Sequence, residues 1–169
     1  MQIFSSITRG CQLLFSVVVV GISANLAKGQ LHGSVPSQTG YAIFTGALGI
    51  LAALIGIVAL FIDSLDGIIT WVLDGVTSLA LLAGGIVIAI AIKGTDCNSK
   101  YDLFHNNLLN TGCSKAELGK DNWTICGTDE SHMHSRCISA RADSAFMFLA
   151  FLACLAAIVA SFLSGRHRR

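Results

Sequence analysis

The chain has 169 residues, of which 53% are hydrophobic and only 12% are charged. A soluble domain carries about 25% charged residues, so this composition excludes an ordinary soluble globular domain. The formal net charge of +1 gives no basis for nucleic-acid binding.

Four charge-poor stretches predict four membrane-spanning helices. A helix needs about 20 apolar residues to cross the hydrocarbon core, and in lipid only such internally hydrogen-bonded segments are stable. The expected spans are residues 10–27, 41–62, 67–92 and 144–164. We therefore expect an all-α membrane protein. Its four-transmembrane-helix bundle would lie within residues 1–165, followed by a basic cytoplasmic tail at 166–169.

The first span has a second interpretation. Arg9 followed by the apolar run Leu13 to Ile22 resembles the start of a signal peptide, and Ala24 to Ala27 would be a small-residue cleavage zone. Cleavage would leave three spans and a mature N-terminus outside the membrane. The residues of this segment leave both possibilities open.

The second and third spans are joined only by Asp63-Ser64-Leu65-Asp66, which predicts antiparallel neighbours. Small residues recur in the last three spans at the spacing that lets helices approach closely in lipid. They either pack the bundle internally or form a face for self-association. They are Gly46, Gly49, Ala53 and Gly56, then Gly75, Ala83, Gly84 and Gly85, then Ala150, Ala153, Ala156, Ala157 and Ala160.

Asp74 is the one ionisable residue within the predicted spans. An acid inside a membrane is costly and is a functional candidate by default. A proton or ion relay normally needs several such groups at matched depth, and the other spans contain none. We therefore favour a polar lock between helices over a relay.

The long connection at residues 93–141 contains four cysteines, Cys97, Cys113, Cys126 and Cys137. It has few apolar residues for a core of its own, so disulfides are expected to compensate. Four cysteines allow three pairings. We favour the nested one, Cys97 with Cys137 and Cys113 with Cys126, while pairing of sequence neighbours stays open. Asn122-Trp123-Thr124 is a glycosylation sequon, which makes Asn122 a candidate glycosylation site.

Charge and cysteine placement predict the orientation. Arg166, Arg168 and Arg169 follow the last span, and cationic flanks prefer the cytoplasm. Four spans would then place both termini, with Arg9, in the cytoplasm and the cysteine-bearing loop outside. Cys11, at the cytoplasmic edge of the first span, becomes a palmitoylation candidate.

The chain shows no pattern typical of catalysis. His132 and His134, with His105, form only a weak metal pattern, and we expect neither metal nor cofactor. Membrane thiol oxidoreductases use a Cys-x-x-Cys pair, which this loop lacks. We therefore expect that the protein is not an enzyme.

The chain resembles fungal MARVEL-domain proteins, close to the non-classical export protein family. The resemblance covers almost the whole chain and depends on short motifs in a fixed order. These are Tyr41-Ala42-Ile43-Phe44-Thr45, Trp71-Val72-Leu73-Asp74, Ala83-Gly84 with Ile92 to Cys97, and Ser135-Arg136-Cys137 with Ala140, Ala142 and Ala145-Phe146.

The resemblance implies four uncleaved helices, cytoplasmic termini and a membrane-organising role in microdomains, vesicle trafficking or membrane apposition. The expected location is the plasma membrane or secretory and endosomal vesicles. The expected partners are the lipid bilayer, further copies of the chain and other membrane proteins. Many relatives have a single cysteine pair that matches Cys97 and Cys137, so Cys113 and Cys126 look like an addition. The alternatives are a tetraspanin-like scaffold and a small oligomeric channel or transporter using Asp74.

Overall fold

The computed structural model describes residues 2–30, 34–59, 68–111, 113–118, 121–126 and 130–167. Side chains are described for these residues except 2–3, 113–118, 121–126, 130 and 163–167. In chain order the elements are α1 (Gln2–Lys28), α2 (Ser37–Ala59), α3 (Ile68–Ala91), α4 (Lys100–His105), β1 (Cys113–Leu118), β2 (Asp121–Cys126) and α5 (Glu130–His167).

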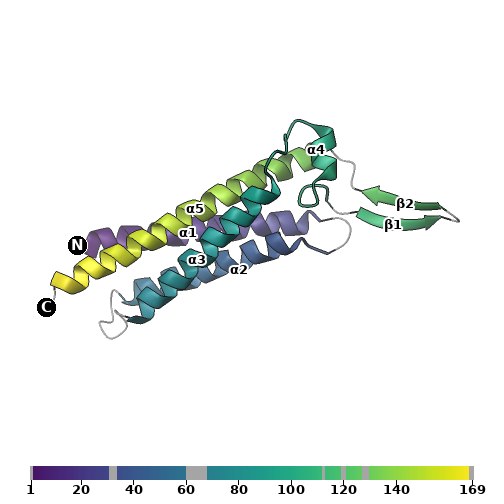
Figure 1. The fold of residues 1–169 in the computed structure, drawn as a ribbon. Coiled ribbons are helices and arrows are strands. Elements are labelled where there is room, and N and C mark those ends of the chain that lie inside the picture. The colour runs from purple at the N-terminus through teal and green to yellow at the C-terminus, as the bar shows by residue number, and fades with distance from the viewer. Residues whose placement is uncertain are drawn as a thin grey trace.

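Helices α1, α2, α3 and α5 form a four-helix bundle in which consecutive helices run antiparallel (Figure 1). Helix α1 packs against α2 and α5, and α3 also packs against α2 and α5. Helices α1 and α3 therefore occupy opposite corners of the bundle. Both chain ends lie at one end of the bundle, whereas α4 and the β1–β2 hairpin lie at the other (Figure 1).

All four bundle helices are long and apolar enough to cross a membrane. The qualifying segments are Phe4–Lys28, Ser37–Ala59, Ile68–Ala91 and Ser131–Phe162. This confirms the prediction of a helical bundle with four candidate spans. The short link predicted at residues 63–66 lies outside the described residues.

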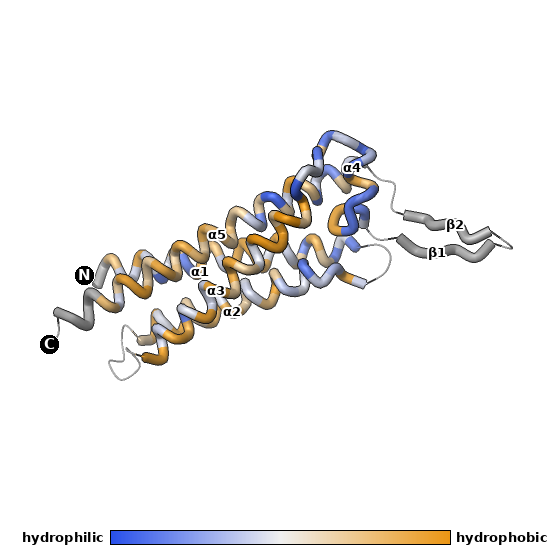
Figure 2. The backbone as a smooth tube through the Cα atoms, viewed as in Figure 1, coloured by the Kyte–Doolittle hydropathy of each residue, from blue (hydrophilic) through white to orange (hydrophobic). Residues whose placement is uncertain are grey.

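Large apolar side chains point outward on every bundle helix, and apolar residues cover most of each helix (Figure 2). Examples are Leu14, Leu51, Leu79 and Leu152, each more than half exposed. Polar side chains are instead buried between the helices, as expected where the surroundings are lipid rather than water. They include Gln12, Ser16, Ser23, Thr39, Thr45, Thr70, Asp74, Thr77, Ser78, Asp143 and Ser144.

The last helix begins well before the predicted boundary at residue 144. Helix α5 starts at Glu130 because its first turns carry a buried stripe at helical spacing, formed by Met133, Cys137 and Ala140. Residues 93–141 were expected to have few apolar residues for a core of their own. Four of them, Cys97, Leu103, Leu108 and Leu109, are buried in the apolar core of the bundle.

Candidate functional site: a buried polar cluster and a disulfide-linked cap

A buried ion pair joins the two helices at opposite corners of the bundle. Nη1 of Arg9 in α1 lies 2.7 Å from both carboxylate oxygens of Asp74 in α3 and donates a hydrogen bond to Oδ1. Only 2% of the Arg9 side chain and 1% of the Asp74 side chain are exposed. The pair therefore crosses the interior of the bundle and links helices that otherwise make little contact.

Gln12 extends the pair into a cluster that spans three helices. Its carbonyl oxygen accepts a hydrogen bond of 3.0 Å from Arg9 Nη1. Its amide nitrogen donates to Asp74 Oδ1 at 3.1 Å and to the Cys154 sulfur of α5 at 3.2 Å. The Arg9–Gln12–Asp74–Cys154 cluster thus fixes the relative positions of α1, α3 and α5.

The cluster lies at a level where the outer surface of the bundle is apolar. Ile7, two residues before Arg9, is 57% exposed, and Val72 and Val76, two residues either side of Asp74, are similarly exposed. A two-residue offset is only about 3 Å along a helix, so the ion pair and these side chains share one level. In the sequence Arg9 lies just before the first expected span, near the N-terminus. In the structure its side chain is buried inside the bundle against Asp74.

Helix α2 contributes no polar side chain to the cluster, but its glycines leave room for side chains of α1. A Cβ atom added at Gly56 would lie 2.7 Å from Nη1 of Arg9 and closer still to its Cζ and Nε. Gly46 and Gly49 approach α1 in the same way, against Val20 and Ser16. These glycines therefore let α1 and α2 pack closely, which is the intramolecular alternative considered for the small residues.

The contact at Gly56 leads to a direct prediction. We expect Gly56→Ala to lower the free energy of unfolding by about 1–3 kcal/mol, because the added methyl group must displace the Arg9 guanidinium. Thermal unfolding in lipid nanodiscs would measure the loss. Gly75→Ala is the matched control, since Gly75 follows Asp74 in α3 and a Cβ there meets nothing within 4 Å. Equal effects of the two substitutions would contradict the close contact.

A second buried acid, Asp143 in α5, lies closer to the end of the bundle that carries α4 and the β1–β2 hairpin, which together we call the cap (Figure 1). Its Oδ2 accepts a hydrogen bond of 2.6 Å from the Ser23 hydroxyl of α1. The next residue, Ser144, donates to the Gly85 carbonyl of α3 at 2.9 Å. Sequence reasoning missed Asp143 because it falls one residue before the predicted fourth span. Helix α1 thus supplies partners to both buried acids.

Apolar side chains separate the two polar levels. Along α1, Val19 lies between Ser16 and Ser23, and it is fully buried. Leu81 of α3 and Met147 of α5 occupy the corresponding stretch of their helices and are also fully buried. On α1, α3 and α5, fully buried apolar side chains therefore lie between the Arg9–Asp74 pair and Asp143, whereas α2 has the buried Thr45 next to Gly46, which approaches Val19.

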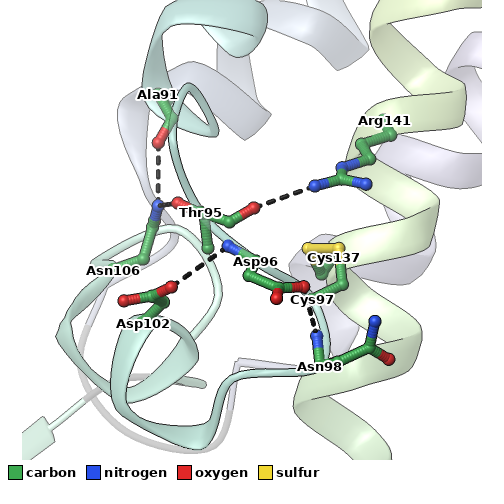
Figure 3. The surroundings of a disulfide bond; sticks show 9 residues. All are labelled: Ala91, Thr95, Asp96, Cys97, Asn98, Asp102, Asn106, Cys137 and Arg141. Atoms are coloured by element: carbon green, nitrogen blue, oxygen red, sulfur yellow. Dashed lines mark hydrogen bonds between the residues drawn. A yellow bond between two sulfur atoms is a disulfide. The ribbon is translucent and has the colours of Figure 1, made fainter.

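A disulfide joins the end of α3 to α5 (Figure 3). Cys97 and Cys137 are bonded, their Cα atoms are 5.7 Å apart, and both residues are buried. Arg141 of α5 reinforces the junction by donating a 2.8 Å hydrogen bond to the Thr95 carbonyl. The outer pair of the favoured nested arrangement is therefore present in the structure.

Arg136 links the cap to the end of α1. It donates hydrogen bonds to the Leu26 carbonyl at 2.8 Å, to the Leu108 carbonyl at 3.2 Å and to the Gln30 side chain at 3.3 Å. A cation at a helix C-terminus is favourable because the last carbonyl groups there lack intrahelical partners. Arg136 and the adjacent disulfide together hold α1, α3 and the cap on α5.

The inner cysteine pair lies on the hairpin. The register of β1 and β2 places the Cα atoms of Cys113 and Cys126 opposite each other. Their side chains are outside the described set, so the Cys113–Cys126 disulfide remains a prediction. Asn122 lies on β2, and its glycosylation also remains a prediction.

The remaining candidate residues are separate from the polar cluster. Cys11 is a free cysteine exposed on α1, and its palmitoylation stays a prediction. His105 belongs to α4 and His132 to the start of α5. In the part of the chain that the structure describes, no group of three or more His, Cys, Asp or Glu side chains could hold a metal ion.

Comparison with known proteins supports the assignment that the fold suggests. The family model for MARVEL, a membrane-associating domain, matches residues 2–160. Neither the curated proteins nor the solved structures contain a significant match to the chain. The matched region includes all three helices of the ion-pair cluster, the disulfide and the cap. The chain therefore belongs to the MARVEL family of membrane-associating domains.

Proposed function

We propose that this protein is a non-enzymatic integral membrane protein that organises or shapes membrane by lateral self-association. One observation carries the proposal. Large apolar side chains face outward on all four bundle helices, while the buried polar groups named above are enclosed between the helices. A surface of this kind offers contacts to lipid and to other apolar helices. Such contacts suit microdomain formation, vesicle trafficking or membrane apposition.

The proposal includes an orientation. Both termini would be cytoplasmic, next to the arginines at the C-terminus, and the disulfide-linked cap would be lumenal or extracellular. The membrane would be the plasma membrane or that of secretory and endosomal vesicles. Retention of α1 is part of the proposal. Cleavage near Ala24–Ala27 would remove Arg9 and Ser23 together and leave Asp74 and Asp143 without these partners.

Reconstitution into liposomes tests the function. We expect the wild-type protein to change vesicle curvature, or its own partition between ordered and disordered lipid, as the protein-to-lipid ratio rises. Cryo-electron tomography and fluorescence imaging would measure these effects. The Asp74→Ala variant is the control, because it keeps the apolar helices but breaks the bundle interior. The same effect from Asp74→Ala would show that the change in the vesicles does not depend on the bundle interior. Vesicles indistinguishable from protein-free ones at every ratio would contradict the proposal.

The cap favours a second candidate, a scaffold for other membrane proteins in the manner of tetraspanins. Helix α4 lies at one end of the bundle, close to the Cys97–Cys137 disulfide, and the β1–β2 hairpin projects beyond it (Figures 1 and 3). Crosslinking from the cap in native membranes distinguishes the two candidates. A scaffold should capture specific partners, whereas a self-associating organiser should capture further copies of the chain.

The channel alternative gains no support from the cluster. Asp74 already lies against Arg9, so its charge is compensated within the protein. Buried apolar side chains at Val19, Leu81 and Met147 also lie between the polar groups of α1, α3 and α5. Unchanged proton or ion flux in vesicles containing Asp74→Asn would reject the channel, whereas loss of a wild-type flux would favour it.

A further inference from the structure

The short helix α4 presents an aromatic surface away from the protein. Tyr101 is 71% exposed and Phe104 is 39% exposed, and His105 is also exposed. Spacings of three and four residues place all three on one face of the helix. The opposite side is fixed by Leu103, which is 1% exposed and belongs to the core. The exposed face is therefore held in a fixed direction by a buried residue.

The His105 ring contacts each of the other two rings. The Tyr101 and His105 ring centroids are 4.2 Å apart, and those of Phe104 and His105 are 5.9 Å apart. The His105 Nδ1 atom also lies 2.9 Å from the Tyr101 carbonyl oxygen. We call Tyr101, Phe104 and His105 the aromatic patch. Because its rings are ordered by these contacts, covering it would cost little side-chain entropy.

The aromatic patch is tied to the point where the lipid-facing surface of α3 ends. Asn106, directly after α4, donates hydrogen bonds to the Ala91 carbonyl at 2.8 Å and to the Thr95 hydroxyl at 3.0 Å (Figure 3). Ile90, the preceding outward residue of α3, is 66% exposed. Lys93 follows it and is exposed. The change from an outward isoleucine to an outward lysine is typical of the boundary between hydrocarbon and headgroups.

The chemistry of the patch fits that boundary. Aromatic side chains with a polar edge concentrate at membrane–water interfaces, where the ring meets acyl chains and the polar atom meets headgroups. Lys93 and Lys100, which precede the patch in the sequence, are exposed and suit phosphate groups. The nearby carboxylate of Asp102 is engaged internally, since its Oδ2 accepts a 3.2 Å hydrogen bond from the Asp96 backbone.

We propose that the aromatic patch lies in the headgroup layer of the leaflet at the cap end and contacts phospholipid directly. Asn106 fastens α4 to the point where the outward apolar surface of α3 ends, which is why we assign the patch to lipid rather than to a protein partner. The contact would fix the depth and tilt of the cap relative to the membrane. This inference rests on the proposed membrane-organising function and specifies which part of the cap touches lipid.

Tryptophan fluorescence in liposomes tests the contact. The probe is Phe104→Trp in a chain whose two native tryptophans are replaced by Trp71→Phe and Trp123→Phe. In phosphatidylcholine vesicles we expect a blue-shifted emission, with stronger quenching by lipid brominated near the headgroup than by lipid brominated deep in the chain. The control is Asn98→Trp in the same background, because Asn98 is exposed in the cap outside the patch. Its emission should resemble that of tryptophan in water, without lipid quenching.

Two outcomes would overturn the inference. If the probe at position 104 behaves like the one at position 98, the patch is in water. If its emission is blue-shifted but no brominated lipid quenches it, protein covers the patch. Neither outcome depends on vesicle shape. Lipid quenching at position 104 with unchanged vesicle curvature and lipid partition would leave the lipid contact standing while contradicting the proposed function.

Discussion

Arg9→Leu is expected to destabilise the protein by about 3–5 kcal/mol, the range measured when one partner of a buried ion pair is removed. The substitution leaves the Asp74 carboxylate buried at an apolar level of the bundle without its counter-charge. Steric trapping or thermal unfolding in bicelles or nanodiscs would measure the loss. We expect the loss of stability to affect the whole bundle rather than α1 alone, since the pair joins α1 and α3 at opposite corners of the bundle.

The double variant Arg9→Leu/Asp74→Leu distinguishes the effect of an uncompensated buried charge from the effect of replacing the Arg9 side chain. Replacing both partners with apolar side chains removes the uncompensated charge, and such replacements are often neutral or stabilising. We therefore expect the double variant to be more stable than Arg9→Leu alone. Lys28→Leu is the matched control, because Lys28 is an exposed basic residue on the same helix. A double variant as unstable as Arg9→Leu would contradict a direct interaction between Arg9 and Asp74.

Removing the Cys97–Cys137 disulfide should have the second large effect. The cysteines are 40 residues apart in sequence, and a chain-entropy estimate gives their closure about 4 kcal/mol. In Cys97→Ala/Cys137→Ala we expect the cap to open before the bundle, because only noncovalent contacts, including those of Arg136 and Arg141, then hold it. Hydrogen–deuterium exchange should show faster exchange in residues 95–111 than in α1 or α3.

The free cysteines provide the control for the disulfide. Cys11→Ser removes an exposed thiol from α1 and is expected to leave both cap exchange and unfolding unchanged. If loss of the disulfide instead accelerates exchange equally in the cap and in all bundle helices, the cap is not a separately held layer. If it changes neither, the closure contributes little to stability.

The four helices were predictable because a long apolar run suffices to specify a membrane span. The burial of Arg9 was not predictable in this way, because a charge near the end of such a run can lie in water or bind a partner inside the bundle. The spacing of polar residues along α1 does indicate a buried polar face. Arg9, Gln12, Ser16 and Ser23, with Val19 between them, follow one another at intervals of three and four residues and so share one helix face. That face is buried in the structure.

The early start of α5 was hidden for a different reason. Residues 130–143 contain many polar residues and no long apolar run, yet Met133, Arg136 and Cys137 are buried. Their stability as a helix depends on contacts with segments far away in the sequence, including the Arg136 bonds to Leu26 and Leu108. The Cys97–Cys137 pairing could be predicted because both cysteines lie close to the ends of predicted spans.

Spin labels at positions 7 and 14 of α1 would test the central claim most directly, which is that the outer surface beside the ion pair lies in lipid. Ile7 and Leu14 are both more than half exposed and bracket Arg9 and Gln12 along the helix. The labels would be introduced as Ile7→Cys or Leu14→Cys in a Cys11→Ser background, with the protein in liposomes. We predict that at both positions collisions with lipid-soluble oxygen exceed those with a water-soluble nickel chelate. Dominant collisions with the nickel chelate at position 7 would place Arg9 at an aqueous level and contradict an intramembrane ion pair.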